Sequence, residues 1–220
     1  MIEKFKGKTV IVYGEPASGK SFTIATIARK IFEKTMIPAY LIWSDTNLFG
    51  EYGKELEEFS KAKVLRITSV NFLFSKLREI FEQDKFNHSF ICLDSLSGIE
   101  EIVTQNESVG SPRRNLLLSQ TARNLTFWLS KIAEKFNIPA FMIAHDTVLF
   151  DKTWRYGEKT KPAFSRRAIK NVDVVIKHEL RFTENNKPYP YWKILLYRSL
   201  KENLEQTSFN PLGEQSDKRL

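Results

Sequence analysis

One eight-residue segment, Gly14 to Ser21, constrains this chain more than any other part of its sequence. It fits the pattern G-x-x-x-x-G-K-[ST] and lies between an apolar run and a segment with apolar residues at helical spacing. Between a strand and a helix, such a loop turns its backbone N–H groups inward around phosphate oxygens, and the helix N-terminus adds partial positive charge. The sequence therefore predicts a nucleoside triphosphate site. The residues expected to hold the nucleotide are Gly14, Glu15, Pro16, Ala17, Ser18, Gly19, Lys20, Ser21 and Phe22.

Two side chains of this loop have expected partners. Lys20 would reach the β- and γ-phosphates, and the hydroxyl of Ser21 would ligate Mg²⁺. Asp94 ends the apolar run 89–94 and would hold the same ion through water. An aspartate at a strand end is otherwise a cap or turn residue, but beside a phosphate loop the metal role is favoured. We therefore expect ATP and Mg²⁺ as cofactors.

Apolar runs of strand length alternate with segments of helical spacing along most of the chain. The expected strands are 8–13, 39–43, 63–67, 89–94 and 140–144, and the expected helices are 20–34, 72–81 and 114–136. Three further strands, 172–180, 191–197 and 205–209, follow with short turns between them. The pattern predicts an α/β fold: a mainly parallel twisted sheet with helices on both faces and an antiparallel C-terminal extension. We expect one domain over 1–212 and a polar, flexible tail over 213–220.

Composition limits the class of protein further. With 220 residues, 42% of them apolar and 27% charged, the chain suits a single globular α/β domain. No apolar run approaches the roughly 20 residues that cross a bilayer, and no secretory signal opens the chain. The single cysteine, Cys92, lies in an apolar run and fits a buried core residue. We expect a cytoplasmic protein without a membrane partner.

The segment 147–170 holds much of the positive charge. The chain has a net charge of +8, and this segment carries +5 of it. Its aromatic residues alternate with cations, a pattern typical of single-stranded DNA binding because cations neutralise phosphates and rings stack on bases. A solvated basic loop is the alternative. The residues expected to contact DNA are Lys152, Trp154, Arg155, Tyr156, Lys159, Lys161, Arg166 and Arg167.

Five motifs in order carry a family resemblance. They are YGEPASGKS, FICLDS, IPAFMIAH, NVDVVIKHEL and ILLYRS. From residue 8 to about residue 210 the chain resembles the RecA-type ATPases, most closely the short archaeal paralogues of the recombinase RadA, of the RadB and RadC kind. The resemblance implies a RecA-like core and a role in homologous recombination and DNA repair.

The resemblance also implies roles near the nucleotide. Asp45 stands where the family has a glutamate that activates the attacking water, and because aspartate is one methylene shorter, hydrolysis should be slow. The alternative for Asp45 is a helix or turn cap. Tyr52 falls where related proteins stack an aromatic ring on adenine, and the alternative is a packing residue in a loop.

Two further positions depart from the family pattern. His145 and Asp146 replace the usual Asn-Gln pair that senses the γ-phosphate, so either could be the sensor, and a structural histidine is the alternative. Arg198 matches the second of two basic positions that reach a neighbouring subunit's γ-phosphate, whereas the first is Leu196. A surface arginine on an edge strand is the alternative.

Two other functions stay open beside a slow recombinase-paralogue ATPase. One is a KaiC-like regulatory ATPase that acts through a protein partner without DNA. The other is an assembly subunit that binds ATP and never hydrolyses it, which Asp45 and the changed sensor pair favour. The sequence fits docking to a recombinase or paralogue partner. We do not expect long filaments of this chain alone.

Overall fold

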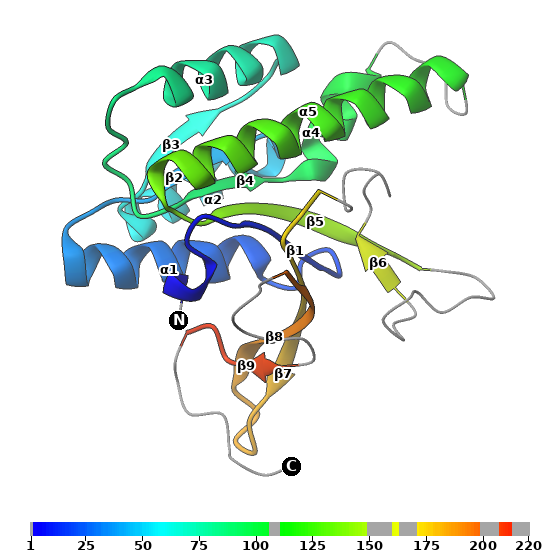
Figure 1. Cartoon of the computed structure of the whole chain (residues 1–220). Coiled ribbons are helices and arrows are strands. Elements are labelled where there is room, and N and C mark those ends of the chain that lie inside the picture. The colour runs from blue at the N-terminus through cyan, green and yellow to red at the C-terminus, as the bar shows by residue number, and fades with distance from the viewer. Residues whose placement is uncertain (1, 106–110, 149–159, 163–170, 199–206, 213–220) are drawn as a thin grey trace.

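The computed structural model describes residues 2–105, 111–148, 160–162, 171–198 and 207–212 of the 220-residue chain. In these residues a curved sheet runs through the middle of the molecule and helices cover both of its faces (Figure 1). One face carries α1 (Lys20–Thr35) and α2 (Glu51–Ser60); the other carries α3 (Val70–Glu82), α4 (Leu96–Thr104) and α5 (Pro112–Phe136). No helix in the described part of the chain has the length and apolar character to cross a membrane.

The described strands form one nine-stranded sheet. They are β1 (Thr9–Gly14), β2 (Tyr40–Trp43), β3 (Lys63–Arg66), β4 (Ile91–Asp94), β5 (Ala140–Val148), β6 (Thr160–Pro162), β7 (Val174–Phe182), β8 (Pro188–Tyr197) and β9 (Ser208–Phe209). Their order is β3-β2-β4-β5-β1-β7-β8-β9, with β6 paired to β5. Neighbours from β3 to β7 run parallel, whereas β8, β9 and β6 pair antiparallel. The predicted fold class is confirmed.

Strand β1 shows why both faces are covered. All six of its residues are buried. Ile11 and Tyr13 pack into a cluster with residues of α3 and α5, whereas Val10 and Val12 pack into the cluster that contains residues of α1 and α2. Because successive side chains of a strand point to opposite faces, a strand that is apolar throughout requires a helix layer on each side.

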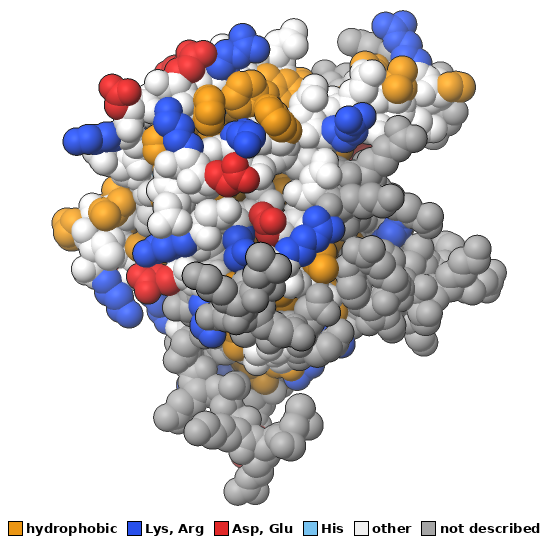
Figure 2. All heavy atoms as spheres, in the orientation of Figure 1, with side chains coloured by type: hydrophobic (Ala, Val, Ile, Leu, Met, Phe, Trp, Pro, Cys, Tyr) orange, Lys and Arg blue, Asp and Glu red, His pale blue; other side chains and the backbone are white. Residues whose placement is uncertain are grey.

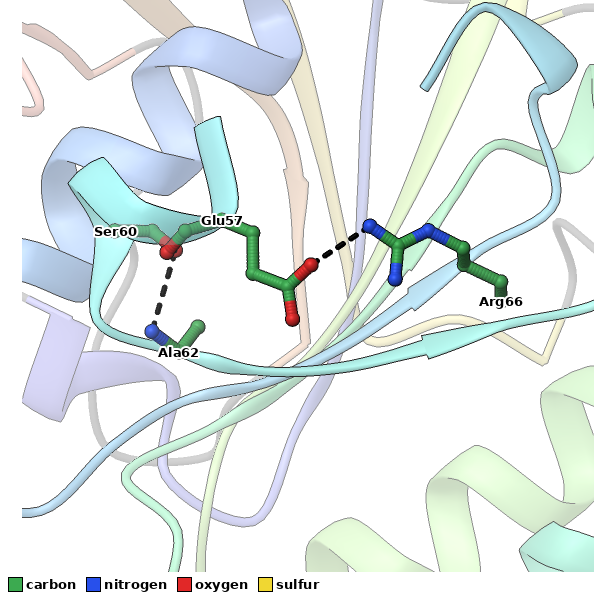
Figure 3. Close-up of polar contacts among 4 residues, drawn as sticks. All are labelled: Glu57, Ser60, Ala62 and Arg66. Atoms are coloured by element: carbon green, nitrogen blue, oxygen red, sulfur yellow. Dashed lines mark hydrogen bonds and ion pairs between the residues drawn. The ribbon is translucent and has the colours of Figure 1, made fainter. Parts of the chain in front are cut away.

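The chain turns sharply from α2 into the edge strand β3. The amide of Ala62 donates to the hydroxyl of Ser60 at 3.2 Å, which closes the turn (Figure 3). Arg66 of β3 then pairs with Glu57 of α2 at 2.7 Å, and its guanidinium lies 5.4 Å from the ring centroid of Trp43. These contacts attach the edge strand β3 to helix α2.

The sequence located most elements within three residues of their ends. It missed α2, α4, β6 and two short 3₁₀ helices, η1 (Ile2–Phe5) and η2 (Thr46–Phe49). Strand β5 continues to Val148, four residues beyond its predicted end, because β6 pairs with that extension. Of the strand expected at 205–209, the structure describes 207–209 and places β9 there. The tail 213–220 lies outside the described residues.

Candidate nucleotide-binding site

The phosphate loop curls between the end of β1 and the start of α1. Ala17 and Gly19 have positive φ angles of 58° and 81°, and alternating left-handed residues make a concave row of backbone N–H groups. A Cβ added at Gly19 would meet nothing within 4 Å, so open space adjoins the loop at this point. Helix α1 has no side-chain cap and no acidic residue in its first turn. These features together suit an anion bound at a helix N-terminus.

Lys20 lies inside this loop. Its side chain is buried, with the residue 5% exposed. Its ammonium donates to the carbonyls of Gly14 at 2.9 Å and Glu15 at 2.5 Å, and to the hydroxyl of Ser18 at 3.3 Å. Burial lowers the pKa of Lys20 to about 8, while the carboxylates of Asp94, Asp146 and Glu15 oppose the shift. A phosphate bound here would stabilise the charged ammonium.

Asp94 ends β4 and lies close enough to Lys20 for their charges to interact. It is 5% exposed, and the side chain of Ser21 lies close enough to affect its pKa, so the structure brings together the two residues predicted to hold Mg²⁺. Burial raises the pKa of Asp94 to about 6; Ser21 and Lys20 lower it, and Asp45 raises it further. The described residues hold no cluster of three or more His, Cys, Asp or Glu that could bind a metal. One carboxylate and one hydroxyl fit Mg²⁺, which takes its other ligands from nucleotide phosphates and water.

The ends of β2 and β4 are tied together by two serines that sequence reasoning did not single out as a pair. The hydroxyl of Ser44 donates to the carbonyl of Ser95 at 2.6 Å and accepts from its amide at 3.1 Å. The amide of Ser44 donates to the carbonyl of Asp94 at 2.8 Å. Asp45 follows directly, and its carboxylate accepts from the amide of Asn47 at 2.9 Å, which caps η2. The capping role is therefore observed, and the catalytic role of Asp45 stays a prediction.

The two sensor candidates extend from β5 beside the loop. His145 pairs in register with Gly14, and burial, followed by the charge of Lys20, lowers the pKa of its imidazole. Asp146 comes next and pairs with Pro162 of β6. The structure places both residues next to the phosphate loop but does not distinguish between them as sensors.

The two aromatic candidates lie on helices. Tyr52 is in α2 rather than in a loop, and its side chain is exposed, with the residue 51% accessible. Partial burial, followed by the nearby charge of Asp94, raises the pKa of Tyr52. Phe22, in the first turn of α1, stacks on Phe59 of α2 with ring centroids 5.5 Å apart. Contact of either ring with a nucleotide stays a prediction.

Arg198 lies at the opposite end of the sheet from the phosphate loop. Its amide donates to the carbonyl of Asp173 at 2.9 Å, and the amide of Asp173 donates to the carbonyl of Thr9, the first residue of β1. The loop begins where β1 ends, at Gly14, about 16 Å away at the usual rise of a strand. Arg198 therefore does not act on the loop of its own chain, and an action on a neighbouring subunit stays a prediction.

The structure describes the segment 147–170 only at its first two residues, which end β5, and at β6. Lys161 lies there, half-buried, opposite Thr147 of β5. The other predicted DNA residues lie outside the described part of the chain, namely Lys152, Trp154, Arg155, Tyr156, Lys159, Arg166 and Arg167.

Sequence reasoning missed one contact on the loop. The imidazole of His178, on β7, lies with its Nε2 atom 2.9 Å from the carbonyl oxygen of Ser18, and the indole N–H of Trp192, on β8, donates to its Nδ1 atom at 2.9 Å. Both side chains are buried. The motif NVDVVIKHEL contains His178, but nothing in the motif shows that this histidine faces the loop.

Comparisons with known proteins bear on the fold of the chain. No protein-family model matches the chain, and no curated protein matches its sequence. The crystal structure of the RadB recombinase is similar, with a TM-score of 0.59 and 16% identity, over 92% of this chain and 86% of that one. A KaiC-like protein from the hyperthermophilic archaeon Pyrococcus horikoshii OT3 is also similar, with a TM-score of 0.53 and 17% identity, over 93% of this chain and 85% of that one. The chain therefore has the RecA-type fold that its motifs predicted, and its resemblance to the RadB kind of paralogue is confirmed at the level of the fold.

Proposed function

We propose that this chain is a cytoplasmic, slow ATPase whose core spans 1–212. It binds ATP with Mg²⁺, contacts single-stranded DNA and assists homologous recombination and DNA repair beside a recombinase or paralogue partner. The observation that carries the nucleotide part is the position of Lys20: its buried ammonium lies inside a curled loop and near the carboxylate of Asp94, which also has Ser21 as a neighbour. Among the described residues, Lys20 is the only lysine that is buried.

The residues of the chain divide the work at this site. Backbone N–H groups of the loop and the ammonium of Lys20 hold and orient the phosphates. Mg²⁺, when bound at Ser21 and Asp94, neutralises charge on the phosphate oxygens. Asp45 orients water and accepts its proton. Because its Oδ1 atom already accepts the hydrogen bond that caps η2, the carboxylate has little freedom to move toward the water. That restriction, added to the shorter side chain, is why we propose slow hydrolysis.

The DNA part rests on a connection between the loop and the segment 147–170. Tyr13, the residue before Gly14, donates from its hydroxyl to the carbonyl of Thr160 at 3.4 Å. Thr160 belongs to β6, which pairs with β5 from Asp146, one of the two sensor candidates, to Val148. Described basic side chains on the face in Figure 2 are spread among acidic and apolar ones, so the concentration of charge in 147–170 remains the best candidate for DNA.

The test is ATP turnover with and without single-stranded DNA at two salt concentrations. We expect stimulation that fades as salt rises. The double variant Trp154→Ala with Arg166→Ala should bind DNA more weakly and lower the salt slope by about 0.7 for the lost cation. The matched control is Lys34→Ala, which removes an exposed cation from the far end of α1. DNA binding that is equal in the double variant and the wild type would overturn the DNA part.

A second function has its own support. The fold is also that of a KaiC-like protein, and Asp45 is occupied as a helix cap. A regulatory or assembly ATPase that acts through a protein partner, with little or no turnover, fits both observations. In this case the same assay gives turnover indifferent to DNA, and the expected partner is a protein, with an oligomer of this chain as one form of it.

A further inference from the structure

The imidazole of His178 lies against the phosphate loop on the side of β7. We propose that His178 is a positioning residue of the nucleotide site: it holds the peptide between Ser18 and Gly19 in its orientation, and Trp192 fixes the imidazole tautomer that makes this contact. The inference rests on the proposed nucleotide-binding function and deepens it.

The tautomer follows from the two hydrogen bonds. An indole N–H is a donor only, so the Nδ1 atom of His178, which accepts from Trp192 at 2.9 Å, carries no proton. The proton of the neutral imidazole is then on Nε2, and this N–H donates to the carbonyl of Ser18 at 2.9 Å. His178 and Trp192 face each other directly in the pairing of β7 with β8. The strand pairing thus places the indole of Trp192 on one side of the His178 imidazole, whose other nitrogen contacts the loop.

The contact sets the direction of a loop N–H group. In a trans peptide the C=O and the N–H point in opposite directions. With the carbonyl of Ser18 directed at His178, the N–H of Gly19 points away from β7. Gly19 is the N-cap of α1 and has a φ of 81°, so its amide is among the groups expected to hold the phosphates. An altered orientation of this peptide would remove one donor from the cradle.

The strands and rings behind His178 are closely packed. A Cβ on Gly14 would lie 2.3 Å from the carbonyl oxygen of His178, so the two strands are in close contact where the loop begins. Trp192 packs against Phe141 and Phe209, with ring centroids 6.3 and 6.0 Å away. These contacts hold the histidine in place beside the loop.

The ring stays neutral at ordinary pH. Burial lowers the pKa of His178 to about 4; the carbonyl of Ser18 and the charge of Glu179 oppose this shift, whereas Lys20 adds to it. A neutral ring keeps Nδ1 free to accept from Trp192. The donor to Ser18 is accordingly present throughout the neutral range.

Two measurements test the proposal. The first is the ¹⁵N shift pattern of the His178 ring in the wild type without nucleotide, which should show a protonated Nε2 and an unprotonated Nδ1. The opposite tautomer would overturn the proposal without any reference to ATP. The second is the affinity for ATP with Mg²⁺ in His178→Gln, which keeps an amide donor, and in His178→Leu, which removes it.

We expect His178→Leu to bind ATP roughly tenfold more weakly than the wild type, as for one lost hydrogen bond, and His178→Gln to bind within about threefold. Both variants should be less stable than the wild type in urea unfolding, since both lose the hydrogen bond to Trp192. If the role of His178 were purely structural, the ATP affinities of the two variants would fall by the same factor. If His178→Leu does not fold, the double variant His178→Leu with Trp192→Phe removes both buried partners and gives the same reading. Equal affinity in the leucine variant and the wild type overturns this inference alone, whereas a wild type that does not bind ATP overturns the proposed function.

Discussion

Replacing Gly98 by alanine should destabilise the protein, although alanine is the better helix former. Gly98 is a buried residue of α4, where the helix crosses the end of β2. An added Cβ would lie 2.4 Å from the carbonyl oxygen of Ser44 and 2.9 Å from the amide nitrogen of Asp45, both backbone atoms. Since real Cβ contacts essentially never fall below 3.0 Å, the helix and the strand end must separate by at least about 0.6 Å.

The two effects of the substitution have opposite signs. Helix propensity alone would stabilise the alanine variant by about 0.5–1 kcal/mol. Overpacking against backbone costs about 1–3 kcal/mol, so the net free energy of unfolding should fall by roughly 0.5–2 kcal/mol. In a domain of this size, that corresponds to a drop in Tm of about 1–8 °C. The separation also moves Asp45 relative to Asp94, so ATP turnover should fall more than ATP affinity.

Thermal and urea unfolding of Gly98→Ala measure the sign. The control is Ser97→Ala, at the neighbouring half-buried position of the same helix, which should change the free energy of unfolding by only a few tenths of a kcal/mol through propensity. A Gly98→Ala protein as stable as the wild type, or more stable, would refute the close contact between α4 and the end of β2.

Three other predictions concern the site and its support. If Tyr52 stacks on adenine, Tyr52→Ala should weaken ATP binding about 2- to 10-fold in calorimetry but leave the affinity for inorganic triphosphate unchanged. Tyr52→Phe should bind ATP as the wild type does, and an alanine variant with the ATP affinity of the wild type would remove that role. Arg66→Met should cost less than about 1 kcal/mol in urea unfolding, because the pair with Glu57 is partly exposed, and a loss above about 2 kcal/mol would contradict this. Burial lowers the pKa of His88 to about 4, below its ordinary 6.5, so the unfolded chain binds a proton there that the folded chain does not. Lowering the pH from 6.5 toward 4 should therefore destabilise the wild type more than His88→Gln. If the free energies of unfolding of the two proteins fall in parallel with pH, the pKa of His88 is not lowered by burial.

The sequence could predict those parts of the site that local pattern determines. An apolar run that ends in Asp94, and a loop followed by Ser21, are both visible in the chain, and parallel pairing brings such strand ends to one edge. Helix α4 was missed because Gly98 interrupts the helical pattern, and the reason for this glycine lies in a strand about fifty residues earlier. Helix α2 was missed because it is short and buries only Gly53, Leu56 and Ser60.

The contact of His178 with the loop could not be predicted for a different reason. It depends on the register of β7 against β8, and that register shifts between Val175 and Ile176. A shift of one residue places Trp192 opposite a different neighbour, and no periodicity in the sequence records it. The position of Arg198, far from its own loop, likewise depends on which strands lie next to β1.

The central claim is that Lys20 and its loop bind a nucleoside triphosphate, and calorimetric titration of ATP with Mg²⁺ into wild type, Lys20→Ala and Lys34→Ala tests it directly. Lys34→Ala is the matched control because it removes the same charge from an exposed position on the same helix. We expect saturable binding in the wild type and in Lys34→Ala, and a loss of at least about 100-fold in Lys20→Ala, as for two charge-assisted hydrogen bonds. Tight binding that survives in Lys20→Ala, or no binding in the wild type, would contradict the assignment.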